Sequence, residues 1–152
     1  MKPIVILLAL TLAGLTGKLT TKEATMIAQG TFEVKVTPQQ AQEGEPFGRL
    51  LIEKRFHGDL DATSRGQMLA AETALEGSGG YVAFELVRGV LNGKRGSFIL
   101  QHKGTMARGV YSMQVTVVPD SGTDELTGID GTMFILIEGS KHSYKFEYMR
   151  PE

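Results

Sequence analysis

Two neighbouring residues, Gln101 and His102, lie in an apolar segment that could carry acid–base chemistry. His102 alternates with Phe98 and Leu100 in residues 96–103, so it shares their face of a strand, while Gln101 lies on the other face. A histidine on an apolar face could act as a general acid or base, because its unperturbed pKa is close to neutral. The alternative is a hydrogen-bonded structural histidine near one end of the fold, since a catalytic base is defined by its geometry with a second group.

Glu85 is the second candidate for acid–base chemistry. In residues 81–87 it alternates with one aromatic and two aliphatic residues, which is the composition of a buried face. A carboxylate inside a barrel would have a raised pKa and could transfer protons at neutral pH. The opposite face is equally apolar, because it consists of Val82, Phe84 and Leu86, so periodicity also allows Glu85 to face solvent.

Gln67 and Tyr111 are further polar residues on mainly apolar faces, where they could orient a ligand. No catalytic residue is identified by a motif. The candidates for ligand binding are therefore Glu85, Gln101, His102, Gln67 and Tyr111.

The sequence predicts neither a metal site nor a cofactor. Its three histidines, His57, His102 and His142, lie in separate segments without the local spacing of metal ligands. Residues 59–63 lack the glycine and the distal glutamate of a calcium loop, and Gly93-Lys94 is followed by a strand instead of the helix of a phosphate loop. No Gly-x-Ser-x-Gly nucleophile motif is present.

The elements that must position these side chains are β-strands. From residue 27 onward the apolar residues recur with period two, and the 19 glycines fall singly between short apolar runs. Asn92-Gly93 predicts a tight hairpin, because both residues accept positive φ. We expect eight strands, at residues 31–36, 49–57, 67–75, 81–91, 95–103, 109–118, 131–138 and 143–149.

Eight sequential antiparallel strands form either a two-sheet sandwich or an up-and-down barrel. The short connections favour the barrel, and closure also removes exposed sheet edges. The predicted fold class is therefore all-β, an eight-stranded antiparallel up-and-down β-barrel behind a short hydrophobic N-terminal leader. Its interior would be filled by side chains or would hold one small ligand.

Length and charge limit the class of protein. The 152 residues fit one domain, which we place at residues 26–152 after a leader at 1–25. Sixteen basic and seventeen acidic residues give a net charge of −1 without long charge runs, so nucleic acid is not an expected partner. The absence of cysteine excludes disulfides and thiolate chemistry.

The first residues bear on localisation. Lys2 precedes fifteen uncharged residues, 3–17, that are typical of a secretory signal and too short to span a bilayer comfortably. A real leader predicts a periplasmic or secreted protein. The second interpretation is that translation starts at Met26, which predicts a cytoplasmic protein. Apart from the possible leader, no part of the chain is expected to interact with a membrane.

The chain contains the segments GTFEV at 30–34, GVLNGKRGSFILQHKG at 89–104 and VPDSGTDEL at 118–126. Together they resemble a bacterial family of uncharacterised proteins whose members look like allene oxide cyclase barrels. The resemblance runs from about residue 28 to 148, although the family pattern usually has glycine where this chain has Asp124. It implies an allene oxide cyclase-like barrel. Allene oxide cyclases and the related dirigent barrels hold apolar molecules and steer cyclisation or coupling without a cofactor, but shared fold does not transfer chemistry.

The function hypothesis is therefore a barrel that binds a small apolar molecule, as a carrier or as a cofactor-free isomerase or cyclase. The alternative is a non-catalytic oligomeric barrel that serves a structural or protein-binding role. It is favoured by strands 81–91 and 131–138, because both are apolar on two faces and would leave one apolar face outside the barrel. We therefore expect the protein to form a homo-oligomer.

Overall fold

The computed structural model describes residues 24–40 and 43–151, and this part of the chain is built from β-strands and one 3₁₀ turn, η1 (Asp124–Leu126). The strands are β1 (Met26–Pro38), β2 (Phe47–Gly58), β3 (Leu60–Glu72), β4 (Gly79–Leu91), β5 (Lys94–Ala107), β6 (Val110–Val117), β7 (Asp130–Glu138) and β8 (Lys141–Met149). Most of the leader predicted at residues 1–25 lies outside the described residues. Within them, no helix has the length and apolarity needed to cross a membrane.

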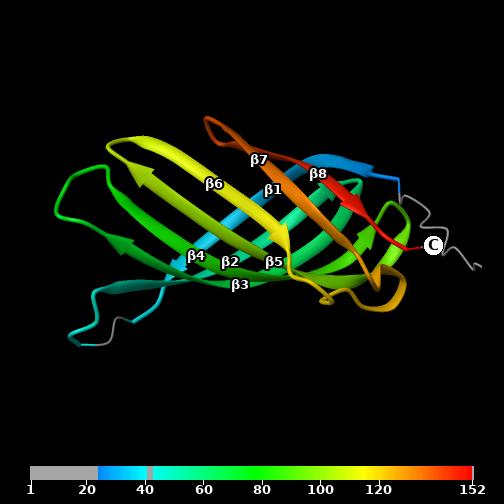
Figure 1. Cartoon of the computed structure of the whole chain (residues 1–152), viewed down its shortest axis with the longest axis horizontal. Helices are drawn as coiled ribbons and strands as arrows, with labels where there is room; N and C mark the ends of the chain where they lie inside the picture. Colours follow the sequence, from blue (N-terminus) through cyan, green and yellow to red (C-terminus); the bar gives the residue numbers. More distant parts are fainter. Residues whose placement is uncertain (1–23, 41–42, 152) are drawn as a thin grey trace, which may run out of the picture.

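The strands form a closed barrel in chain order. Each strand pairs antiparallel with the next, and β8 pairs with β1 to close the ring (Figure 1). The predicted eight-stranded antiparallel barrel is confirmed. The Asn92-Gly93 turn has φ values of 45° and 80° and joins β4 to β5 in register, as its sequence predicts.

The prediction for the third strand was wrong in its bounds. β3 starts at Leu60, seven residues before the expected 67–75, and it ends at Glu72, so Leu75 lies exposed in the following loop. The chain reverses at once after Gly58, whose φ of 102° favours glycine, so no linker separates β2 from β3. The inward residues that follow are small or polar and therefore hide the alternation; they are Ala62, Ser64 and Gly66.

One end of the barrel is filled by side chains. This end holds the β2–β3 and β4–β5 turns and η1, and Phe146 stacks there against Phe98 and Tyr148 at centroid distances of 5.6 and 5.1 Å. Leucines and Ile129 complete the packing; the leucines are Leu60, Leu91 and Leu126. Close packing of this kind leaves no room for a ligand at the closed end.

The other end is open. The β3–β4 and β5–β6 hairpins extend together beyond the packed part (Figure 1). In the described residues β6 and β7 share one residue pair, Thr116 with Thr132, and each continues toward the open end without pairing to the other. The inward side chains here are partly exposed, among them Met113 and Ile135. The interior can therefore be reached from this end.

Candidate functional site

Four polar side chains from neighbouring strands meet inside the barrel: Lys54 of β2, Ser64 of β3, Glu85 of β4 and His102 of β5, each at most 8% exposed. Lys54 Nζ donates a hydrogen bond to Glu85 Oε2 at 2.8 Å. Ser64 Oγ donates to Glu85 Oε1. His102 Nε2 lies 2.8 Å from Glu85 Oε2. We call these four residues the polar cluster, and its centre is the Glu85 carboxylate.

Strand alternation and register bring the cluster together. The inward residues of β2 are Ile52, Lys54 and Phe56, so the lysine occupies an interior position between two apolar ones. Lys54 pairs with Ser64 across β2 and β3, and Glu85 pairs with Gly66 across β3 and β4.

Gly66 allows the close approach of β3 and β4 at Glu85. A Cβ at residue 66 would lie 2.5 Å from the Phe84 carbonyl oxygen and 3.0 Å from Glu85 Cα. Both atoms belong to the backbone, which cannot rotate away as the end of a side chain can. Glycine is the residue that fits where another backbone comes this near.

The positive charge of Lys54 is stabilised by Glu85 and by two aromatic rings. Its Nζ lies 4.9 Å from the centroid of Phe32 and 5.6 Å from that of Phe56. The negative face of each ring attracts a cation at this range. A charged lysine can therefore remain in an interior that is otherwise mostly apolar.

Glu85 is a carboxylate at neutral pH. Burial alone raises its pKa, but the contact with His102 and the positive charge of Lys54 outweigh burial and lower the pKa to about 2. The raised pKa predicted from the sequence was wrong, because that prediction considered burial without the lysine. Glu85 can accept hydrogen bonds and balance positive charge, but it holds no proton to donate near neutral pH.

His102 is the unsatisfied member of the cluster. Nε2 is 2.8 Å from the carboxylate, but the pair does not meet the full geometry of a regular hydrogen bond. Among the buried side-chain nitrogen and oxygen atoms of the described residues, this nitrogen is the one without a hydrogen-bond partner. Such atoms are few in native proteins and call for an explanation.

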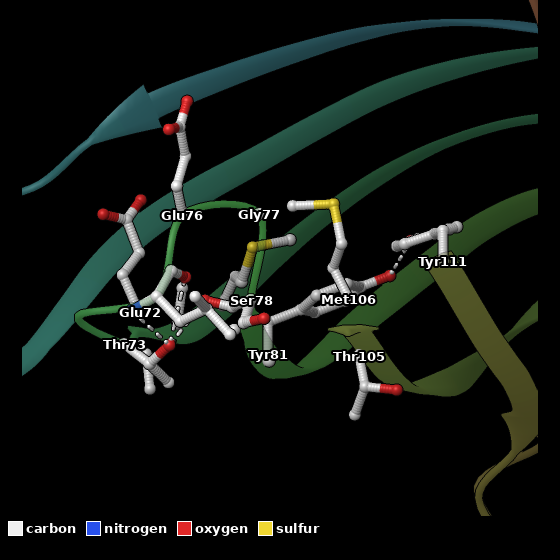
Figure 2. A pocket seen from close by; sticks show the side chains of 15 residues that line it. Glu72, Thr73, Glu76, Gly77, Ser78, Tyr81, Thr105, Met106 and Tyr111 are labelled. Carbon is white, nitrogen blue, oxygen red and sulfur yellow. Dashed lines mark hydrogen bonds between the residues drawn. The ribbon is translucent and has the colours of Figure 1, made fainter. Parts of the chain in front are cut away.

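A cavity of about 400 Å³ opens at the unfilled end of the barrel. Its walls are inward residues of β3 to β6, including Met68, Ala70, Tyr81, Met106 and Tyr111, and its rim is the β3–β4 loop. Figure 2 shows the phenol groups of Tyr81 and Tyr111 facing each other, with their oxygens 3.0 Å apart. Burial and this contact raise the pKa of Tyr81, so its hydroxyl stays protonated at neutral pH.

One row of paired residues leads from the cavity wall toward the polar cluster, although none of the four cluster residues lines the cavity itself. Met68, which lines the cavity, pairs with Ala83, and Ala83 pairs with His102 on the next strand. The residue between the cavity wall and the imidazole therefore has only a methyl side chain. Two residues closer to the mouth, the ring of Tyr81 lies against Gly104, where a Cβ would overlap the ring.

Comparison with known protein families identifies the family of this chain. Residues 28–148 match the family described as "Protein of unknown function (DUF3224)". This chain belongs to the DUF3224 family. A crystal structure of a DUF3224 protein with unknown function from Shewanella oneidensis MR-1 is 44% identical, covers 85% of this chain and 99% of its own, and superposes with a TM-score of 0.79. No curated protein matches the chain.

In the DUF3224 barrel, some of the candidate residues predicted from the sequence lie in the interior and others lie on the outer surface. Glu85 and His102 meet in the polar cluster, and Tyr111 lines the cavity. Gln67 and Gln101 lie on the outer surface, one on each side of Phe84, and so do not face a ligand inside the barrel.

Sequence reasoning missed Lys54 and Ser64. Lys54 had a usable signal, because it alternates with Ile52 and Phe56 in one strand. Ser64 had none, since a small polar residue is equally common on either face. In the described residues no group of three or more His, Cys, Asp or Glu side chains is arranged to hold a metal ion.

Proposed function

We propose that this DUF3224 protein binds a small, largely apolar molecule in the cavity at the open end of its barrel. The observation that carries the proposal is the unequal filling of the interior. An eight-stranded barrel can be filled by side chains or hold one small ligand. Here the closed end is packed with aromatic rings and leucines, while the open end keeps a cavity of about 400 Å³.

The lining supports a ligand with an apolar body. Small-molecule sites are mostly apolar, with a few polar groups that fix orientation. Met68 and Met106 provide adaptable apolar surface, and the Tyr81 and Tyr111 hydroxyls provide polar points. A cofactor-free isomerase or cyclase would also need an acid or base: Glu85, held as a carboxylate, could accept a proton, and His102 is the group suited to donate one.

Filling the cavity should abolish binding of a neutral apolar probe. We expect N-phenylnaphthylamine to gain fluorescence with the wild-type protein and to bind Ala70→Trp at least about tenfold more weakly, because the indole would occupy the cavity. Gln67→Trp is the matched control, since residue 67 is on the same strand but faces outward. Equal binding by wild type and Ala70→Trp would show that the probe binds elsewhere.

A second proposal is that the barrel is a homo-oligomer. It is supported by an outer apolar patch, which we call the β4 patch, formed by Phe47, Leu69, Val82 and Phe84. Phe84 is 57% exposed, and exposed apolar clusters of this kind often mark subunit contacts. The likeness to allene oxide cyclase barrels remains a prediction from the sequence.

The oligomer proposal predicts that Phe84→Lys dissociates the assembly, because it places a charge in the β4 patch at its most exposed residue. Sedimentation velocity over a concentration series would show a larger species for wild type and a monomer for the variant. Glu53→Lys changes an outward residue of β2 outside the patch and should leave the mass unchanged. A monomeric wild type at every concentration would reject the proposal.

A further inference from the structure

We propose that the molecule bound in the barrel carries a carboxylate, and that Lys54 and His102 receive it. This inference rests on the proposed binding function and names the chemical class of its ligand. Its basis is an imbalance in the polar cluster between hydrogen-bond donors and acceptors.

Both oxygens of the Glu85 carboxylate already face groups of the protein. Ser64 donates to one oxygen of Glu85, and Lys54 donates to the other, which also faces His102. Each carboxylate oxygen of Glu85 therefore already contacts a side chain of the protein.

The donors of the cluster are in excess. The ammonium of Lys54 has three N–H groups, and its one side-chain hydrogen bond in the described part of the chain goes to Glu85. The rings of Phe32 and Phe56 attract its charge but offer no lone pair. His102 Nε2 also lacks a regular partner, and it is a donor whenever it carries a proton. A further oxygen acceptor would satisfy both residues, and a carboxylate supplies two.

Charge points to the same class of ligand. Glu85 faces the ammonium of Lys54 and the imidazole of His102, and the imidazole becomes a second cation whenever it takes up a proton. An uncompensated charge in an apolar interior is costly, and a bound carboxylate would neutralise it. An amine would add a further positive charge, and an alcohol would supply an acceptor without the charge.

The cavity offers a path for the carboxylate. Met68 in the cavity wall, Ala83 and His102 occupy one row across β3, β4 and β5. Adjacent strands are about 4.8 Å apart, so the backbone of His102 is about 10 Å from that of Met68, and the residue between them in the row has only a methyl side chain. An alkyl chain in the apolar mouth would extend its carboxylate past Ala83 to the cluster.

Calorimetric titration with three eight-carbon ligands tests the inference: octanoate, octanol and octylamine, which differ in the head group alone. Wild-type protein is expected to bind octanoate at least about tenfold more tightly than octanol, and octylamine most weakly. Lys54→Met alone would leave Glu85 buried and unpaired, so the variant used is Lys54→Met/Glu85→Leu. Its preference for octanoate over octanol should be reduced, because His102 alone remains to receive the carboxylate.

His102→Leu provides the second variant, because it keeps the Lys54–Glu85 pair intact. It should reduce the preference for octanoate, whereas His57→Leu, which changes an exposed histidine, should leave it unchanged.

Equal binding of octanoate and octanol by wild type would overturn this inference and leave the proposed function standing. A preference that is undiminished in both cluster variants would also overturn it. Binding of none of the three ligands would contradict the inference, and failure of N-phenylnaphthylamine to bind as well would contradict the proposed function.

Discussion

Glu85→Leu is expected to lower the free energy of unfolding by about 3–5 kcal/mol, because it leaves the ammonium of Lys54 buried without its counter-charge. Both partners of this pair are almost fully buried, at 6% and 0% side-chain exposure. Water therefore cannot replace the lost carboxylate, and the phenyl rings near Lys54 compensate only part of the charge. Urea unfolding at neutral pH measures the loss.

The double variant Lys54→Met/Glu85→Leu should recover most of this stability. Replacing a buried ion pair by apolar residues of similar volume is often neutral or stabilising, whereas removing one partner is not. Glu33→Leu is the surface control, because Glu33 and His57 form an exposed pair that should contribute nothing measurable. If the single and double variants were equally unstable, the loss would come from packing and not from an unpaired charge.

Most of the fold could be predicted because its signals are local. Strand alternation and short turns such as Asn92-Gly93 depend on neighbours in sequence, and they indicated eight antiparallel strands in chain order. The start of β3 was missed where the local signal is weak. Its inward residues Ala62, Ser64 and Gly66 are small or polar, so the sequence of β3 alone does not mark them as inward. Their face is set by the register of β3 with the neighbouring strand.

The candidate site could be predicted only in part, because its chemistry depends on register between strands. Glu85 and His102 were found as polar residues on apolar faces, but their contact requires the pairing of β4 with β5. Lys54 was missed because lysine is rarely buried unless it is paired, and its partner is 31 residues away. The direction of the Glu85 pKa shift was wrong for the same reason, since Lys54 opposes the effect of burial.

The pH dependence of stability offers an independent test of the cluster. In the folded protein the pKa of Glu85 is about 2, and its ordinary value is 4.5. A lowered pKa stabilises the folded state above the ordinary value, and this stabilisation is lost as the pH falls from 4.5 toward 2. The shift corresponds to roughly 3 kcal/mol at neutral pH.

Glu85→Gln isolates this contribution, because glutamine resembles the protonated side chain and retains Ser64, Lys54 and His102 around it. We expect wild type to be more stable than the variant by roughly 3 kcal/mol at neutral pH, and the difference to shrink steadily below pH 4.5. Urea unfolding of both proteins across this pH range measures it. A difference that stays constant with pH would mean that the glutamine disturbs packing instead of removing a charge. A shrinking difference would establish that Glu85 is ionised in the folded protein near neutral pH, with its pKa kept below the ordinary value by His102 and Lys54.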